Sequence, residues 1–357
     1  MLPFPHPNLA ALAVSVGLLA GAGTDAEDAR ASAQGLRVDP ALPIYEPTDG
    51  VSGTIKSIGS DTMNNLMALW AEGFVREYPN VQVEIEGKGS STAPPALTEG
   101  TANFGPMSRP MKEKEIEEFA KAHGYGPTAI PTSIDMLAVF VNKDNPIESL
   151  TLEEVDAIFS ANRIGGHPEN ITTWGQLGLT GEWTFARIQT YGRNSASGTY
   201  GFFKSEALFG GDFKSSVKEQ PGSSAVVQAV AEERHAIGYS GIGYRTADVR
   251  AVPIVGDDGR PIAPSPQTVR DYPLWRFLYT YVNYEPGKPL DPLRREFLEF
   301  VFSRRGQEIV LKDGYLPVPA TVARNAMREV NVDLALRPEL SSTEPSPAST
   351  DGYDGSR

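Results

Sequence analysis

Cysteine is absent from this chain of 357 residues, and histidine occurs only four times. The absence of cysteine excludes disulfides, thiol nucleophiles, thiolate metal sites and a lipid attached to an N-terminal cysteine. The histidines are scattered and never stand at metal-ligand spacing (His6, His123, His167 and His235). A zinc hydrolase needs a denser cluster of His, Asp and Glu side chains. We therefore expect neither a metal ion nor any other cofactor.

Positive charge is also scarce, because 32 Lys and Arg residues stand against 45 Asp and Glu, for a net charge of −13. Nucleic acids and anionic membranes attract proteins through a basic surface, so neither is an expected partner. A hydrophobic content of 40% and a charged content of 22% are typical of a soluble globular protein. A small anion would have to be captured by local geometry, against the long-range field of the protein.

Long apolar runs are missing as well, and the run Leu9–Gly23 falls short of the about 20 residues of a transmembrane helix. Its length is that of the apolar region of a signal peptide, and small-residue cleavage patterns stand at 20–22, within the run, and at 31–33. Met1–Asn8 contains no Lys or Arg, so an uncleaved anchor or a misassigned start codon stays open. We expect 1–33 to be a signal peptide or leader, and the mature protein to be periplasmic or secreted.

Strand-like and helix-like segments alternate from Gly53 to about Leu336, which predicts an α/β architecture with a largely parallel sheet. Period-2 alternation or a continuous apolar run predicts strands, and a helical apolar stripe predicts helices. The clearest strands are 81–87 and 136–142, and the clearest helices are 63–78 and 292–312. Residues 34–50 are polar without a period and are expected to form a linker. Residues 337–357 have few hydrophobic residues and are expected to be a disordered tail.

Four polar turns resemble one another, and each is predicted to join the end of a strand to the start of a helix. They are Ile58–Met63 (IGSDTM), Gly87–Thr92 (GKGSST), Gly105–Pro110 (GPMSRP) and Gly192–Thr199 (GRNSASGT). The first turn of a helix has backbone N–H groups without partners and a positive dipole end, which suits an anion. Glycine lets the backbone approach the anion closely, and Ser and Thr hydroxyls add donors. The pattern indicates an oxyanion site.

Each turn has an ordinary alternative, because Ser, Thr and Asp are also common N-caps. The fourth turn is more specific, since Arg193 stands at a fixed distance before Ser197-Gly198-Thr199. A guanidinium can form two parallel charge-assisted bonds to an oxyanion. A surface salt bridge is the alternative role for this arginine.

With these turns the chain resembles the periplasmic phosphate-binding proteins of phosphate ABC importers, which have the type II periplasmic binding protein fold. The resemblance covers roughly 53–319 and is most specific at Arg193-x-x-x-Ser197-Gly198-Thr199. Other shared segments are 135–139 (DMLAV), 236–239 (AIGY) and 314–317 (GYLP). It implies two lobes, each a mixed sheet flanked by helices, which are joined by two crossing strands. The implied lobes are 51–133 with 282–336, and 134–281.

The resemblance also implies the ligand and the site. Inorganic phosphate would be gripped by Arg193, Ser197, Gly198 and Thr199 from lobe two. Lobe one would supply Asp61, Thr62, Ser90 and Ser108, with Ser60, Gly89, Ser91 and Arg109 as further candidates. The lobes would close by a hinge motion, and the protein, expected to be a monomer, would deliver phosphate to the permease subunits of an ABC importer.

The chain departs from the family at two positions. Family members keep an aspartate in the third turn, where it accepts the proton of hydrogen phosphate, and this chain has Ser108 there. Asp61 stands where the family usually has Thr or Ser. Our hypothesis is that the acceptor role has moved to Asp61, and the alternative is that Asp61 only caps the helix after it. Arg109 is either a second cation for the ligand or a rim residue.

Other functions stay open at this point. The ligand could be sulfate, molybdate or tungstate, which competition binding would separate. A secreted phosphoester hydrolase is a further alternative, although neither a histidine nor a metal cluster lies near the serines in sequence. The fold could also serve a secreted accessory or adhesion protein. We expect a binding protein and not an enzyme.

Overall fold

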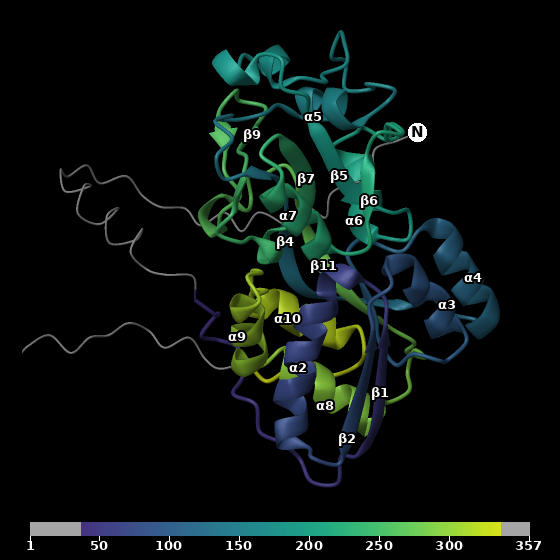
Figure 1. The fold of residues 1–357 in the computed structure, drawn as a ribbon. Coiled ribbons are helices and arrows are strands. Elements are labelled where there is room, and N and C mark those ends of the chain that lie inside the picture. Colours follow the sequence, from purple (N-terminus) through teal and green to yellow (C-terminus); the bar gives the residue numbers. More distant parts are fainter. Residues whose placement is uncertain (1–36, 337–357) are drawn as a thin grey trace, which may run out of the picture. The chain divides into compact units, whose positions relative to one another are not determined.

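Two antiparallel strands, β4 (Thr128–Asn142) and β11 (Trp275–Val282), run side by side through the centre of the fold (Figure 1). The computed structural model describes residues 37–336, and the unit that begins at Val38 contains all the helices and strands described here. The expected signal peptide, 1–33, and the expected tail, 337–357, lie outside the described residues. Within 37–336, no helix has both the length and the apolar character required to span a bilayer.

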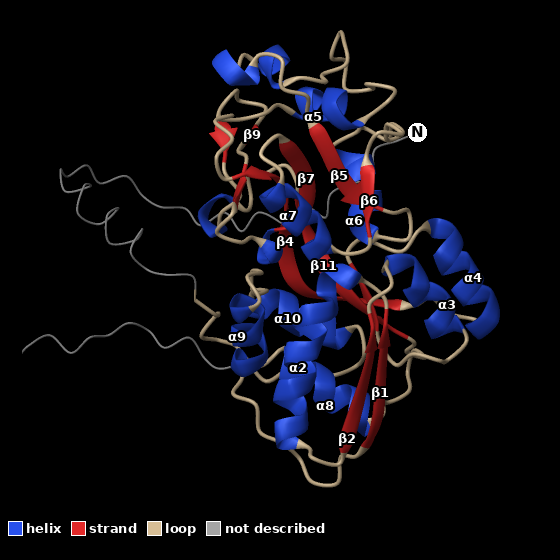
Figure 2. Cartoon of the chain, in the orientation of Figure 1, coloured by secondary structure: helices blue, strands red, loops and turns tan. Residues whose placement is uncertain are grey.

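The other elements follow the predicted alternation of strands and helices (Figure 2). The remaining strands are β1 (Gly53–Ile58), β2 (Val81–Glu86), β3 (Gly105–Met107), β5 (Gln189–Arg193), β6 (Lys218–Gln220), β7 (Ala236–Gly241), β8 (Val249–Ala251), β9 (Ile254–Val255) and β10 (Pro261–Ile262). The α-helices are α2 (Asn64–Glu77), α3 (Ala93–Thr98), α4 (Glu113–His123), α5 (Leu152–Phe159), α6 (Gly198–Glu206), α7 (Ser223–Glu232), α8 (Pro292–Val301), α9 (Arg304–Lys312) and α10 (Ala320–Arg328).

The sheets are mixed, so the prediction of a largely parallel sheet is wrong. Among the described residues, the largest sheet has seven strands in the order β3-β11-β4-β7-β5-β6, with β8 also paired to β4. Only β5–β6 and β5–β7 are parallel in it, and β1–β2 forms a separate parallel pair. Each antiparallel pair of this sheet contains β4 or β11: β4 pairs with β11, β7 and β8, and β11 also pairs with β3. The alternation of elements along the chain does not reveal these pairs.

The hydrophobic interior is divided into two main cores, one at each end of the β4–β11 strand pair. The first core includes Leu66, Trp70 and Phe297 and takes its buried residues from 42–130 and 278–334. The second includes Phe159, Trp174 and Tyr239 and takes its buried residues from 136–274 together with Leu316. We call the parts built on these cores lobe one and lobe two. The lobe bounds predicted above remain a prediction.

The helix predicted over 292–312 is two helices, α8 and α9, so this prediction is corrected. The Ser303 hydroxyl accepts a hydrogen bond from the amide of Gly306 at 3.1 Å and donates one to the carbonyl of Phe300 at 2.6 Å. An N-cap in the middle of an apolar stripe starts a new helix without interrupting the helical period. The Trp70 indole also donates to the Gly306 carbonyl at 2.8 Å, which joins α9 to α2.

The segment 38–50, predicted as part of a linker, contains no helix or strand but packs along lobe one. Leu42 is fully buried in the first core. The Asp39 carboxylate accepts a hydrogen bond from the amide of Ala320 at 2.8 Å, at the start of α10. The Tyr45 hydroxyl lies 2.8 Å from that of Tyr78 and 3.1 Å from the Glu296 carboxylate. Single anchoring residues without a period leave no sequence pattern, so the linker prediction missed this packing.

Removal of the buried anchor should destabilise the protein. We expect Leu42→Ala to lower the free energy of unfolding by roughly 2–5 kcal/mol, because it leaves a cavity in a close-packed core. Urea unfolding of the purified protein measures this difference. Ile44→Ala is the matched control, since Ile44 is 59% exposed and should change stability by less than about 0.5 kcal/mol. Equal effects of the two substitutions would show that 38–50 is not anchored.

Candidate functional site

Three serine hydroxyls from the first three turns meet in lobe one. The Ser60 hydroxyl donates to the Ser108 hydroxyl at 3.0 Å, and the Ser90 and Ser108 hydroxyls lie 3.3 Å apart. The amide of Ser108 donates to the Ser90 hydroxyl at 3.0 Å. All three side chains are buried. The strands β1 and β2 are parallel and end beside each other, which brings the first two turns to one edge.

The third turn is not the strand-to-helix junction that the sequence predicts. Gly105–Met107 is itself the strand β3, paired with β11, and α4 begins only at Glu113. Proline is tolerated in β3 because this strand is at the end of the ladder. Ser108 therefore reaches the site from the end of a strand, and its position depends on the pairing with β11.

The fourth turn supplies the lobe-two side of the site. Ser197 is the N-cap of α6, since its hydroxyl accepts from the amide of Tyr200 at 3.3 Å. Gly198 and Thr199 form the first buried turn of that helix. The Thr199 hydroxyl lies 2.7 Å from the Thr62 hydroxyl of lobe one. The structure thus brings the predicted residues of both lobes together at the N-termini of α2 and α6.

Gly89 and Ser91 join the two lobes through the backbone of the fourth turn. The amide and the hydroxyl of Ser91 donate to the carbonyl of Ala196 at 3.2 and 2.8 Å. Gly89 has a φ of +123°, and an added Cβ would lie 2.5 Å from the same carbonyl. Both residues therefore support contact between the turns, and the Ser91 hydroxyl is engaged by protein.

Arg193 lies at the end of β5 and is only 3% exposed. One terminal nitrogen, Nη1, donates to the Ser223 hydroxyl at 2.7 Å and lies 3.2 Å from Oδ2 of Asp61. Its Nε is buried and has no hydrogen-bond partner among residues 37–336. Burial lowers the pKa of the Arg193 guanidinium and the neighbouring Asp61 opposes this shift, although arginine remains charged in proteins. Other arginines among residues 37–336 also have an unpartnered Nε, but Arg193 is almost fully buried and its charge lies at the turn of Ser197–Thr199, which suits an anion.

Asp61 links the two lobes instead of capping its own helix. Its Oδ2 accepts a hydrogen bond from the amide of Ser223 at 2.8 Å, at the first turn of α7 in lobe two. Asp61 begins a short 3₁₀ helix, Asp61–Met63, that leads into α2. The side chain of its N-cap residue, Ser60, makes no cap hydrogen bond, and neither does that of Asp61. The sequence reasoning missed Ser223, although the Gly222-Ser223-Ser224 turn before α7 has the same pattern as the four turns.

Arg109 is held by Glu115 in a two-pronged pair, with N–O distances of 2.7 and 2.6 Å. Burial is the largest single influence on Glu115 and disfavours its ionisation, but the hydrogen bonds from Arg109 and the Lys112 amide, together with the charges of these two residues, hold the pKa of the Glu115 carboxyl below its usual value. A guanidinium engaged in this way has few donors left for a ligand. This geometry favours the rim role for Arg109.

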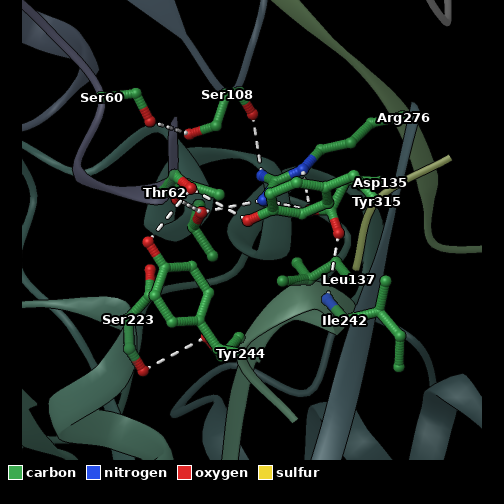
Figure 3. Close-up of polar contacts among 12 residues, drawn as sticks. Ser60, Thr62, Ser108, Asp135, Leu137, Ser223, Ile242, Tyr244, Arg276 and Tyr315 are labelled. Atoms are coloured by element: carbon green, nitrogen blue, oxygen red, sulfur yellow. Dashed lines mark hydrogen bonds and ion pairs between the residues drawn. The ribbon is translucent and has the colours of Figure 1, made fainter. Parts of the chain in front are cut away.

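Four further residues around the site were not predicted as ligands, and Figure 3 shows how they lie against the first turn. The hydroxyls of Tyr244 and Tyr315 donate to the Thr62 carbonyl at 3.2 and 2.9 Å. Burial raises the pKa of both phenols. Asp135 and Arg276, on the two central strands, form a buried ion pair with a 2.8 Å separation. Asp135 and Tyr315 lie in the shared segments 135–139 and 314–317, but their contacts with the site depend on partners that are far away in sequence.

The described residues show no metal centre. Within 37–336, no three His, Asp or Glu side chains are grouped so that they could hold a metal ion. Besides the Asp61 carboxylate, the polar groups of the four turns are hydroxyls, backbone amides and the Arg193 guanidinium, which suit hydrogen bonding to an oxyanion.

Comparison with known proteins identifies the class to which this two-lobed architecture belongs. A family model described as the PBP superfamily domain matches residues 46–305. The phosphate-binding protein PstS of Pseudomonas aeruginosa is 55% identical over 298 residues, which cover 83% of this chain and 92% of that protein. The chain therefore belongs to the PBP superfamily, among the relatives of the phosphate-binding protein PstS.

Solved structures lead to the same fold. A substrate-binding protein from Clostridium perfringens, solved with bound phosphate, has a TM-score of 0.63 at 26% identity and covers 74% of this chain and 100% of its own. An ABC-type phosphate transport receptor from Vibrio cholerae has a TM-score of 0.58 at 23% identity and covers 74% of this chain and 100% of its own. The predicted α/β fold, with two lobes and mixed sheets, is confirmed.

Proposed function

We propose that this protein captures inorganic phosphate between its two lobes and delivers it to an ABC importer, outside the cytoplasm. The observation that carries the proposal is the buried Arg193, whose Nε has no partner among residues 37–336 and whose Nη1 is held by Ser223 and Asp61. The similarity to PstS, at 55% identity, supports phosphate as the ligand. The relatives form a family of binding proteins, which speaks against the hydrolase alternative.

In this proposal each lobe supplies half of the ligand shell. Arg193, Ser197, the Gly198 amide and Thr199 bind from lobe two, and Asp61, Thr62, Ser90 and Ser108 bind from lobe one. The donors are buried, so the cost of dehydrating the anion is offset by many directed hydrogen bonds, some of them charge-assisted. This arrangement explains how a protein with a net charge of −13 holds an anion. Closure of the lobes about β4 and β11 completes the shell.

The transport partner is proposed from the family alone. The closed protein, acting as a monomer, would dock on the permease subunits of the importer and release phosphate to them. The proposed location, the periplasm or the exterior, depends on the signal peptide expected within 1–33.

Calorimetric titration of the ligand-stripped protein tests the proposed ligand. We expect phosphate to bind with a stoichiometry of one and sulfate, molybdate and tungstate to bind much more weakly. No heat with phosphate would refute the proposal, and a clear preference for another oxyanion would replace phosphate as the ligand.

Asp61 is proposed as the group that distinguishes phosphate from sulfate, by accepting the proton of hydrogen phosphate. Its Oδ2 is engaged by the Ser223 amide and lies near Arg193, so the second carboxylate oxygen, Oδ1, would serve the ligand. We expect Asp61→Asn to weaken phosphate binding about 10- to 100-fold and to strengthen sulfate binding, because the carboxamide replaces an acceptor by a donor. Competition between the two anions measures this. If Asp61→Asn still rejects sulfate and binds phosphate normally, Asp61 does not select the ligand, and its role is to link the two lobes.

A further inference from the structure

Arg276, on β11, contacts lobe one, lobe two and the strand between them (Figure 3). Its Nη1 donates to the Ser108 carbonyl at 2.7 Å. Its Nε and Nη2 lie 3.0 and 2.8 Å from Oδ2 of Asp135 on β4, and Nη2 also lies 2.9 Å from the Thr199 hydroxyl. The side chain is almost completely buried. Nε and Nη2 have a protein partner for each of their hydrogens, and Nη2 is shared between Asp135 and Thr199, so this edge of the guanidinium acts on a ligand through Thr199.

The contact with Thr199 has a direction that chemistry imposes. A guanidinium only donates, so the Thr199 oxygen accepts from Arg276, and its one hydrogen must point elsewhere. The Thr62 oxygen lies 2.7 Å away and either hydroxyl can be the donor. If the Thr199 hydroxyl donates to Thr62, the hydroxyl hydrogen of Thr62 is free to bind a ligand. If Thr62 donates to Thr199 instead, the hydroxyl hydrogen of Thr199 is free. In both arrangements the pair presents a donor.

A cation at the start of this chain also strengthens it. Each hydroxyl that accepts from a charged donor becomes a better donor itself, because hydrogen bonds in series polarise one another. The chain from Arg276 to Thr199 to Thr62 crosses from the central strands through lobe two into lobe one. The Thr62–Thr199 contact joins the two lobes directly, since these residues lie 137 positions apart in the sequence and on opposite lobes.

We infer that Arg276 is a positioning residue that acts through the Thr199–Thr62 hydroxyl pair and fixes this pair as a hydrogen-bond donor to an unprotonated oxygen of the bound anion. The inference rests on the proposed function and deepens it, because such a donor favours the more deprotonated form of phosphate. Asp135 has a supporting part, since its carboxylate holds the guanidinium in the orientation that reaches Thr199.

Arg276→Lys tests the inference while it keeps the charge opposite Asp135. A lysine ammonium is a point donor and cannot reproduce the planar fork that spans Asp135, Ser108 and Thr199. We expect titration with inorganic phosphate to show binding about 10- to 100-fold weaker. As the pH is raised through the second ionisation of phosphate, we expect the phosphate affinity of Arg276→Lys to rise less than that of the native protein. Arg250→Lys is the matched control, since Arg250 binds the Asn145 carbonyl outside the cleft, and it should bind normally.

Double variants test the hydroxyl chain itself. Thr62→Val should weaken phosphate binding to a similar degree. The double variant with Arg276→Lys should bind less than about threefold more weakly than either single variant, because both substitutions disrupt the same chain of hydrogen bonds. In a Thr199→Val background, Arg276→Lys should have no further effect. The inference would be overturned if the losses of affinity from the two single substitutions multiplied in the double variant. Normal affinity and normal pH dependence in Arg276→Lys would overturn it as well. If Arg276→Lys does not fold, the neutral pair Arg276→Gln with Asp135→Asn takes its place, with the same two outcomes. Absence of phosphate binding in the native protein would refute the proposed function instead.

Discussion

Replacement of Arg193 by glutamine is expected to weaken phosphate binding roughly 100- to 1,000-fold. The substitution removes a buried charge whose Nε has no partner among residues 37–336, and loss of one partner from a desolvated charge pair costs about 2–5 kcal/mol. It also removes the cation that lies 3.2 Å from Oδ2 of Asp61, so an anionic ligand would meet this carboxylate without compensation. Calorimetric titration of the ligand-stripped variant with phosphate measures the loss.

The matched control is Arg234→Gln. Arg234 forms a two-pronged pair with Glu182 at 3.0 and 2.6 Å, but both side chains are exposed. Exposed ion pairs contribute little, so phosphate affinity should change less than about twofold. An Arg193→Gln variant that stays within tenfold of the native affinity would remove Arg193 from the site, and the proposed ligand shell with it.

Gly198→Ala is expected to prevent closure of the lobes while the unliganded protein stays folded. An added Cβ would lie 2.2 Å from the Ser90 hydroxyl and 2.6 Å from that of Ser108, both on the opposite lobe. Gly198 does not have a positive φ, so alanine fits the local backbone and the clash exists only when the lobes meet. Overpacking of this kind costs about 1–3 kcal/mol, so phosphate affinity should fall on the order of 10- to 100-fold.

Gly201→Ala is the control for this substitution because it lies in the same helix, α6. A Cβ there would lie 3.4 Å from Arg109, which is ordinary contact. Alanine in a helix interior stabilises by about 0.5–1 kcal/mol, so the thermal midpoint should rise slightly while phosphate binding is retained. Small-angle scattering with and without phosphate distinguishes the two variants. Compaction of Gly198→Ala by phosphate, to the same extent as the native protein, would contradict the expected clash.

Much of the fold could be predicted because its signals are local. The strands at 81–86 and 136–142 follow from short apolar patterns, and so does the helix over 64–77. Two errors arose where a long-range contact decides: the packing of 38–50 and the antiparallel centre of the sheet depend on residues that meet only after folding. The break at Ser303 is a local N-cap, and the apolar stripe that continues across it concealed it.

The sequence by itself determined the first, second and fourth Gly-hydroxyl turns and the Arg193 motif, because a glycine, a hydroxyl and a helix start lie within a few residues of one another. Only the tertiary structure decided how these groups are used. The Asp61 carboxylate accepts a hydrogen bond from the amide of Ser223, 162 residues away, and Arg276 donates one to the hydroxyl of Thr199, 77 residues away. Those contacts depend on the register of β4 against β11 and on closure of the lobes, which no local pattern encodes.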